Sequence, residues 1–118
     1  MHPHTYVART AFAELLALPG APATVAPLLP RLLPPLRAAL VSPDASVVAT
    51  ALLAIQQVSA CVGEALTPCV TPLLVQINKH DTNRALRDAV RATLEALEVN
   101  GGPQAGALLR AKLPSYGR

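Results

Sequence analysis

Basic side chains that could bind an acidic protein surface are concentrated in one stretch: Lys79, Arg84, Arg87 and Arg91. In a helix that begins at Arg84, the three arginines recur at i, i+3 and i+7 and therefore share one face. They lie near the helix N-terminus, where the helix dipole disfavours cations. Cations placed against the helix dipole, with no compensating gain in stability, are typical of a surface kept for function. We expect this face to meet an acidic protein surface, and the alternative is an ordinary solvated helix face.

A second basic group lies towards the C-terminus and combines Arg110, Lys112 and Arg118. Charged chain ends are common, so this group is the weaker candidate for a partner-binding site. Two further arginines, Arg31 and Arg37, lie on a mostly apolar unit. Their spacing is typical of long side chains that run along a helix edge and keep their charged heads in water.

No combination of residues indicates catalysis or metal binding. Cys61 and Cys69 are far apart for a metal site and have no further ligands at close spacing, so we interpret them as small buried hydrophobic residues. His2 and His4 lie at a chain end, which holds a ligand set poorly. His80, in a polar loop, belongs to no recognisable triad. With no phosphate-binding glycine loop and no nucleophile elbow, we predict a non-enzymatic protein without cofactor or metal.

The overall composition excludes several classes of partner. The formal net charge of +3 is lower than a duplex-DNA binder requires, and one Phe, two Tyr and no Trp offer little for stacking bases. Two cysteines are too few for a disulfide scaffold, which favours an intracellular protein with reduced thiols. We therefore expect protein partners and no nucleic acid.

The elements that position these residues are predicted to be helices only, because alanine and leucine dominate and period-two alternation is rare. The apolar faces recur at helical spacing, at Leu66, Val70, Leu73, Leu74 and Ile77 and again at Leu86, Val90, Thr93, Leu94 and Leu97. The predicted helices are Thr5–Leu18, Ala23–Val41 with a kink around Pro30–Pro34, Ala45–Val62, Glu64–Asn78, Arg84–Val99 and Gln104–Lys112, with a polar loop at Lys79–Asn83.

The helix Ala45–Val62 carries no charged side chain and must therefore be covered on several sides. Ser42 is its predicted N-cap, followed by Pro43 at the first helical position and by Asp44, and Gly63 ends it. The segment is long enough to cross a membrane. It contains polar side chains and lacks flanking Lys or Arg and interfacial aromatics, so we predict a packed helix and no membrane contact.

Two stretches of similar length have the same predicted order of helices. Ala23–Val62 and Glu64–Val99 each pair a proline-bearing helix with a proline-free one, over roughly the 40 residues of a HEAT repeat. The predicted architecture is an all-α, HEAT/armadillo-like right-handed stack of antiparallel helix pairs in one domain, residues 1–118. It would comprise about two repeats plus capping helices, since end repeats of a solenoid need caps.

A series of motifs occurs along the chain: His2 to Val7, Gly20-Ala21-Pro22, Pro27 to Val41, Val62-Gly63, Thr93 to Glu98, Gly101-Gly102 and Lys112 to Tyr116. Together these motifs resemble the parkin co-regulated protein family, and more closely its parkin co-regulated-like branch. The resemblance covers essentially the full length, and its most specific parts are the proline-leucine block and the Gly-Gly then Pro-x-Tyr ending.

This resemblance implies a HEAT/armadillo-like domain of cilia and flagella. The founding member resembles a microtubule-associated scaffold at the junction of the two tubules of the axonemal doublet, where it binds tubulin and a small ciliary protein. We accordingly expect a non-enzymatic scaffold in the axoneme or basal body, in the cytoskeleton of the cytoplasm. The first alternative is a general cytosolic HEAT-type protein–protein adaptor, and a further one is a lipid- or membrane-surface protein that uses the apolar excess. The sequence leaves the oligomeric state open.

Overall fold

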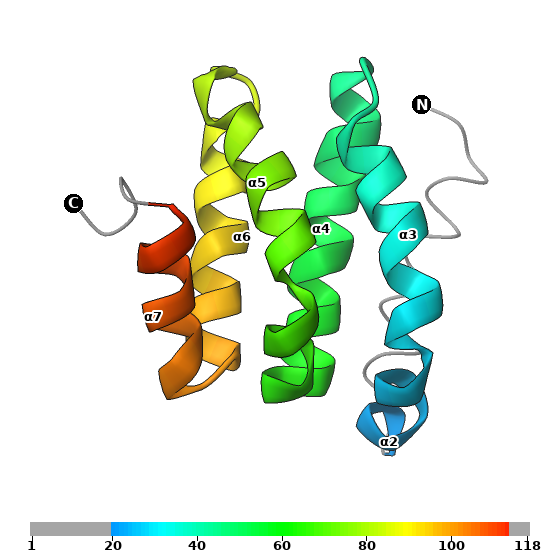
Figure 1. Cartoon of the computed structure of the whole chain (residues 1–118). Helices are drawn as coiled ribbons and strands as arrows, with labels where there is room; N and C mark the ends of the chain where they lie inside the picture. Colours follow the sequence, from blue (N-terminus) through cyan, green and yellow to red (C-terminus); the bar gives the residue numbers. More distant parts are fainter. Residues whose placement is uncertain (1–19, 114–118) are drawn as a thin grey trace.

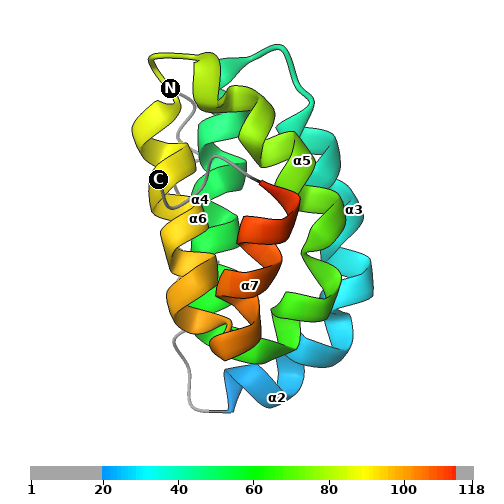
Figure 2. The ribbon, with the colours of Figure 1, turned by 60° about the vertical axis from the view of Figure 1, so that its left-hand side comes forward.

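Helices in two layers make up the part of the chain that the computed structural model describes, residues 20–113. One layer holds α3 (Leu29–Leu40), α5 (Thr71–Lys79) and α7 (Pro103–Lys112) side by side, and the other holds α4 (Ala45–Val62) and α6 (Arg87–Asn100) (Figures 1 and 2). No strand occurs between residues 20 and 113, so the predicted all-α class is confirmed. The predicted helix Thr5–Leu18 lies outside the described residues.

The proline-bearing first unit starts with two short pieces, α2 (Ala21–Val25) and the 3-10 helix η1 (Ala26–Leu28). The break therefore lies before Pro30, and the prediction of a kink around Pro30–Pro34 is wrong in position. Pro30 occupies the first turn of α3, where its missing N–H would have no partner in any case. Pro34 and Pro35 lie inside α3, which continues through them.

The predicted helix Glu64–Asn78 is in fact two elements. A 3-10 helix, η2 (Gly63–Cys69), leads through Val70 into α5. Pro68 and Pro72 lack the amide hydrogens that a continuous α-helix would need across this stretch, and Pro72 is tolerated because it lies in the first turn of α5. Two prolines four residues apart thus separate one helical pattern into two pieces.

The start of α4 differs from the predicted cap. The N-cap is Asp44, whose Oδ1 accepts hydrogen bonds from the Ser46 amide at 2.9 Å and the Ser46 hydroxyl at 2.8 Å. Ser42 instead accepts the amide of Asp44 at 3.1 Å, and Pro43 precedes the helix. Asp44 takes the role because its backbone is extended, as an N-cap requires. These bonds to Ser46 lower the pKa of Asp44 below its ordinary value.

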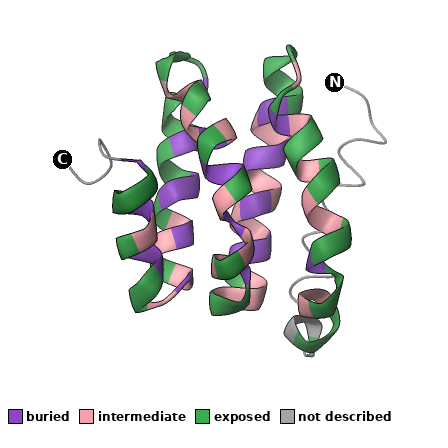
Figure 3. Ribbon diagram, viewed as in Figure 1, coloured by how far each residue is buried: buried purple, intermediate pink, exposed green. Residues whose placement is uncertain are grey.

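The core lies between the two layers, and Figure 3 shows buried stretches on α4, α5 and α6. All ten apolar-face positions predicted for residues 66–97 are buried, which confirms both helical patterns. Gly63 ends α4 as predicted, with a φ of 59° that favours glycine.

Polar side chains connect α4 to α6 inside this core. The Gln56 amide donates to the Thr93 hydroxyl at 3.0 Å, and the Asn100 amide donates to the Ser59 hydroxyl at 3.0 Å. Ser59 and Thr93 are buried. A shift of one helix along the other would leave these groups unpaired, at a cost of about 1–3 kcal/mol each, so they fix the register of α4 against α6.

One helical stretch of the described residues, Ala45–Cys69, is long and apolar enough to cross a membrane, with a mean hydropathy of 1.7. A core helix passes the same test. In this structure α4 packs against α2, α3 and α6, and the α-helix ends at Gly63. The absence of membrane contact stays a prediction.

Candidate protein-binding surface

The four basic residues singled out in the sequence gather where α5 passes into α6. Lys79 is the last residue of α5, and the 3-10 helix η3 (His80–Thr82) and a turn lead to α6 (Figure 1). All four side chains are exposed. We call this group the basic end, and it comprises Lys79, Arg84, Arg87 and Arg91.

Arg84 does not lie on the helix, contrary to the prediction. The α-helix begins at Arg87, and Arg84 belongs to the preceding turn. The turn forms because Asn83 Oδ1 accepts the amide of Ala85 at 3.0 Å, while its carbonyl accepts the amide of Leu86 at 3.0 Å. Asparagine is favoured in such turns, since its side chain competes with the helix for nearby amides. Only Arg87 and Arg91 therefore share a face of α6.

The charges of the basic end are largely unopposed. Arg87 donates from Nε to the backbone carbonyl of Asp81 at 3.2 Å, which anchors the guanidinium over η3 without neutralising it. Among the described residues, neither Arg84 nor Arg91 forms an ion pair with Asp88, the carboxylate between them in the sequence. The basic end therefore presents cationic donors to solvent.

His80 holds the basic end against the first helix pair. Its Nε2 forms a hydrogen bond with the backbone carbonyl of Leu40, the last residue of α3, 40 residues earlier in the chain. The bond satisfies one of the carbonyls that a helix C-terminus leaves open. Sequence reasoning gave His80 no role, because a partner this far away leaves no local signal.

The second basic group is partly neutralised. Arg110 Nη1 lies 3.4 Å from Glu98 Oε2, and this pair joins α7 to α6. Both side chains are well exposed, so the pair contributes little to stability. Lys112 is exposed at the end of α7, and Arg118 lies outside the described residues. This group remains the weaker candidate.

The sequence model of the parkin co-regulated protein family matches residues 1–118, the whole chain. The chain belongs to the parkin co-regulated protein family. The predicted family is therefore confirmed, and the finer placement in its parkin co-regulated-like branch stays a prediction. No solved structure matches the chain.

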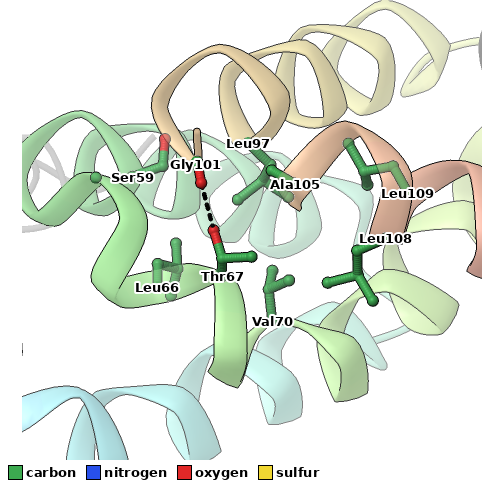
Figure 4. Close-up of a pocket in the computed structure, with 10 residues that line it drawn as sticks. Ser59, Leu66, Thr67, Val70, Leu97, Gly101, Ala105, Leu108 and Leu109 are labelled. Atoms are coloured by element: carbon green, nitrogen blue, oxygen red, sulfur yellow. Dashed lines mark hydrogen bonds between the residues drawn. The ribbon is translucent and has the colours of Figure 1, made fainter. Parts of the chain in front are cut away.

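In this parkin co-regulated family member, a small cavity lies where η2 meets α6 and α7 (Figure 4). Its volume is about 10 Å³, too small for anything beyond a single water molecule. Thr67 closes it by donating its hydroxyl to the Gly101 carbonyl at 3.1 Å. A Cβ at Gly101 would lie 2.7 Å from Thr67 Oγ1, so the close approach requires glycine.

The two cysteines are free, as predicted, but only half-buried rather than buried. Burial raises the pKa of the Cys61 thiol, which lowers its reactivity because the thiolate is the nucleophile. Cys69 is the last residue of the 3-10 helix η2 and lines a groove between α3 and α5. No group of three or more His, Cys, Asp or Glu side chains suited to a metal occurs within residues 20–113.

Proposed function

We propose that this chain is a non-enzymatic scaffold protein of cilia or flagella that binds microtubules in the axoneme or basal body. Family membership supports the setting, because the founding member resembles an axonemal microtubule scaffold. The partner would be tubulin or a tubulin-associated protein, contacted through the basic end. Nucleic acid, membrane and cofactor have no part in this mechanism.

The observation that carries the proposal is the set of exposed, unopposed cations at the basic end. Arg87 is pre-positioned by the Asp81 carbonyl, so it loses less freedom on binding than a free arginine would. Arg84 and Arg91 are exposed and form no ion pair with the described carboxylates. Such charges steer an acidic partner and set orientation more than they add affinity.

We infer that the two layers form a short HEAT/armadillo-like stack. The pairs α3–α4 and α5–α6 each combine a proline-bearing helix with a proline-free one, and α7 covers the end (Figure 2). The hydrogen bonds from Gln56 to Thr93 and from Asn100 to Ser59 hold one pair rigidly against the next. A rigid stack suits a static scaffold, because it presents its surface without a cost of ordering.

Microtubule co-sedimentation tests the proposal. Reversing Arg84, Arg87 and Arg91 to Glu together should weaken pelleting at least about tenfold, since each exposed charge contact contributes a few tenths to 1 kcal/mol. Raised salt should weaken the binding of the wild-type chain as well, because exposed charges are screened.

The matched control compares two double variants of equal charge change. Arg87→Glu with Arg91→Glu should lose binding, whereas Arg31→Glu with Arg37→Glu, both exposed on α3, should keep it. If both double variants lost microtubule binding equally, the effect would come from net charge and not from the basic end. Unchanged pelleting of a folded triple variant, or absence of a tagged copy from cilia, would favour the general cytosolic adaptor.

A further inference from the structure

A groove of about 590 Å³ lies between α3 and α5, on the layer that does not contain the basic end of α6. This volume falls within the range of about 300–1,000 Å³ that is usual for binding pockets. The groove opens to solvent, since most of its rim residues are exposed. It is lined by Pro30, Leu33, Pro34, Arg37, Ala38 and Val41 of the first unit and by Cys69, Pro72, Leu73 and Gln76 of the second.

The groove runs along the middle of α3, which is less buried than the two ends of the helix. Only Leu29 and Leu40, at its two ends, are buried. Pro34, inside the helix, removes the amide that would bond the Pro30 carbonyl, and Pro35 does the same to Arg31. Leu33 in the middle of α3 is half-buried against the core, and the apolar wall that it helps to form ends just after the helix at Val41, with 60 % of its surface exposed.

The groove carries positive charge and no negative charge. Arg37 is its only charged lining residue, and the described structure gives its side chain no hydrogen bond or ion pair. No Asp or Glu lines the groove, and none occurs from residue 20 to residue 43. Gln76, on α5, adds a polar group to the opposite wall.

We propose that this groove binds a short amphipathic segment of a partner protein that carries a carboxylate on the edge of its apolar face. Apolar side chains would cover Leu33, Ala38 and Pro72, while the carboxylate pairs with Arg37. From Pro30 to Val41 the wall is about 16 Å long at the rise of an α-helix. This length matches a helix of about three turns, with anchors at i, i+3 or i+4 and i+7.

The groove is independent of the basic end and of the proposed microtubule binding. The groove is lined on α5 by Pro72, Leu73 and Gln76, whereas the basic end starts at Lys79, the last residue of α5, and continues onto α6, so the two share no residue. A chain that binds through the groove and through the basic end would connect a second protein to an acidic surface.

The test is selection of a displayed library of random peptides, about 14 residues long, against the full chain. Enriched peptides should combine Asp or Glu with apolar residues at helical spacing. Synthetic copies should then bind the wild-type chain in fluorescence anisotropy. Arg37→Glu should weaken them about fivefold or more, from loss and reversal of an exposed ion pair. Arg31→Glu, an equal charge change on α3 outside the groove lining, is the matched control and should bind as the wild type does.

Ala38→Trp gives a second, steric test. Ala38 is an exposed helical position, so the variant should fold, yet the indole would occupy the groove. Peptide binding should fall more than about tenfold, because a built-in clash rejects the ligand. Microtubule pelleting by this variant should be unchanged, which separates this proposal from the proposed function.

Three results would overturn the proposal: no enrichment of peptides, enrichment of peptides without acidic residues, or equal binding by wild type and Ala38→Trp. Self-association in analytical ultracentrifugation that Ala38→Trp abolishes would also overturn it, since the occupant would then be a second copy of the chain.

Discussion

The contact between α4 and α6 and the contact between α3 and α5 are built from different side chains. The first buries Leu52, Ile55 and Val90 almost completely and adds the hydrogen bond between Gln56 and Thr93. The second leaves a groove with Arg37 and three prolines at its edges. Both contacts join neighbouring helices of one layer, and the residue types alone make one tight and the other open.

This difference separates stability from binding within one small domain. The helices of the α4–α6 layer contain no proline, and their buried positions are apolar except for Ser59 and Thr93, which are hydrogen-bonded, so this layer can hold the fold. The α3–α5 layer has prolines that limit its packing and a charge without a partner. Exposed positions tolerate substitution with little change in stability, so the exposed wall of α3 can carry a binding surface at little cost to the fold.

The largest expected effect tests whether α4 carries the stability. Leu52→Ala should lower the free energy of unfolding by about 2–5 kcal/mol, because Leu52 is fully buried. Leu33→Ala, the same change on the half-buried wall of the groove, should cost only about 1 kcal/mol. Urea unfolding followed by circular dichroism measures both. Equal losses would contradict the division between the two layers.

A smaller effect of opposite sign is expected in α3. Pro34→Ala should raise the free energy of unfolding by about 1–2 kcal/mol. The substitution restores a helical amide hydrogen bond, and this gain is larger than the loss caused by the greater entropy of the unfolded chain. Pro103→Ala is the control, because Pro103 occupies the first turn of α7, where no amide partner is needed. A Pro34→Ala variant less stable than the wild type would show that its ring packing outweighs the lost hydrogen bond.

The smallest effect concerns Asp44, which joins the two layers between α3 and α4. Hydrogen bonds from Ser46 lower the pKa of Asp44 in the folded chain below its ordinary value of 3.8. The ionised Asp44 cap therefore stabilises the folded state at any pH above 3.8. That stability is lost as the pH falls through the lowered pKa. Thermal unfolding of Asp44→Asn, which keeps a cap, should match the wild type at neutral pH and be less sensitive to acid.

Asp44→Ala provides the complementary control. It removes the acceptor of the Ser46 amide at every pH, so it should unfold at a lower temperature throughout the range. An acid sensitivity in Asp44→Asn equal to that of the wild type would assign the pH dependence to other carboxylates.

Several parts of the fold could be predicted because they depend on local periodicity. The buried positions from Leu66 to Leu97 and the helix end at Gly63 follow from side-chain spacing and backbone freedom. The start of α6 could not, because Asn83 captures the amide of Ala85 and keeps Arg84 out of the helix. A helix start is a competition between nearby caps that differ by fractions of a kcal/mol, which a pattern does not resolve.

The candidate site divides in the same way. The basic residues were identified from their types and spacing, whereas the groove was missed entirely. Its walls come from two segments, residues 30–41 and 69–76, that are distant in the sequence, and no local pattern shows that Arg37 and Gln76 face the same space. The one signal available was the clustering of prolines in otherwise apolar helices, which predicts irregular packing.

By itself, the sequence determined the helical class, the inward faces of the helices, the family and the excess of basic groups, since each depends on residue type and short-range spacing. Only the tertiary structure decided that Arg110 meets Glu98, that His80 reaches Leu40 and that α3 and α5 leave a groove. These features depend on which helices become neighbours. That choice is made by the summed burial of the whole core and not by any one segment.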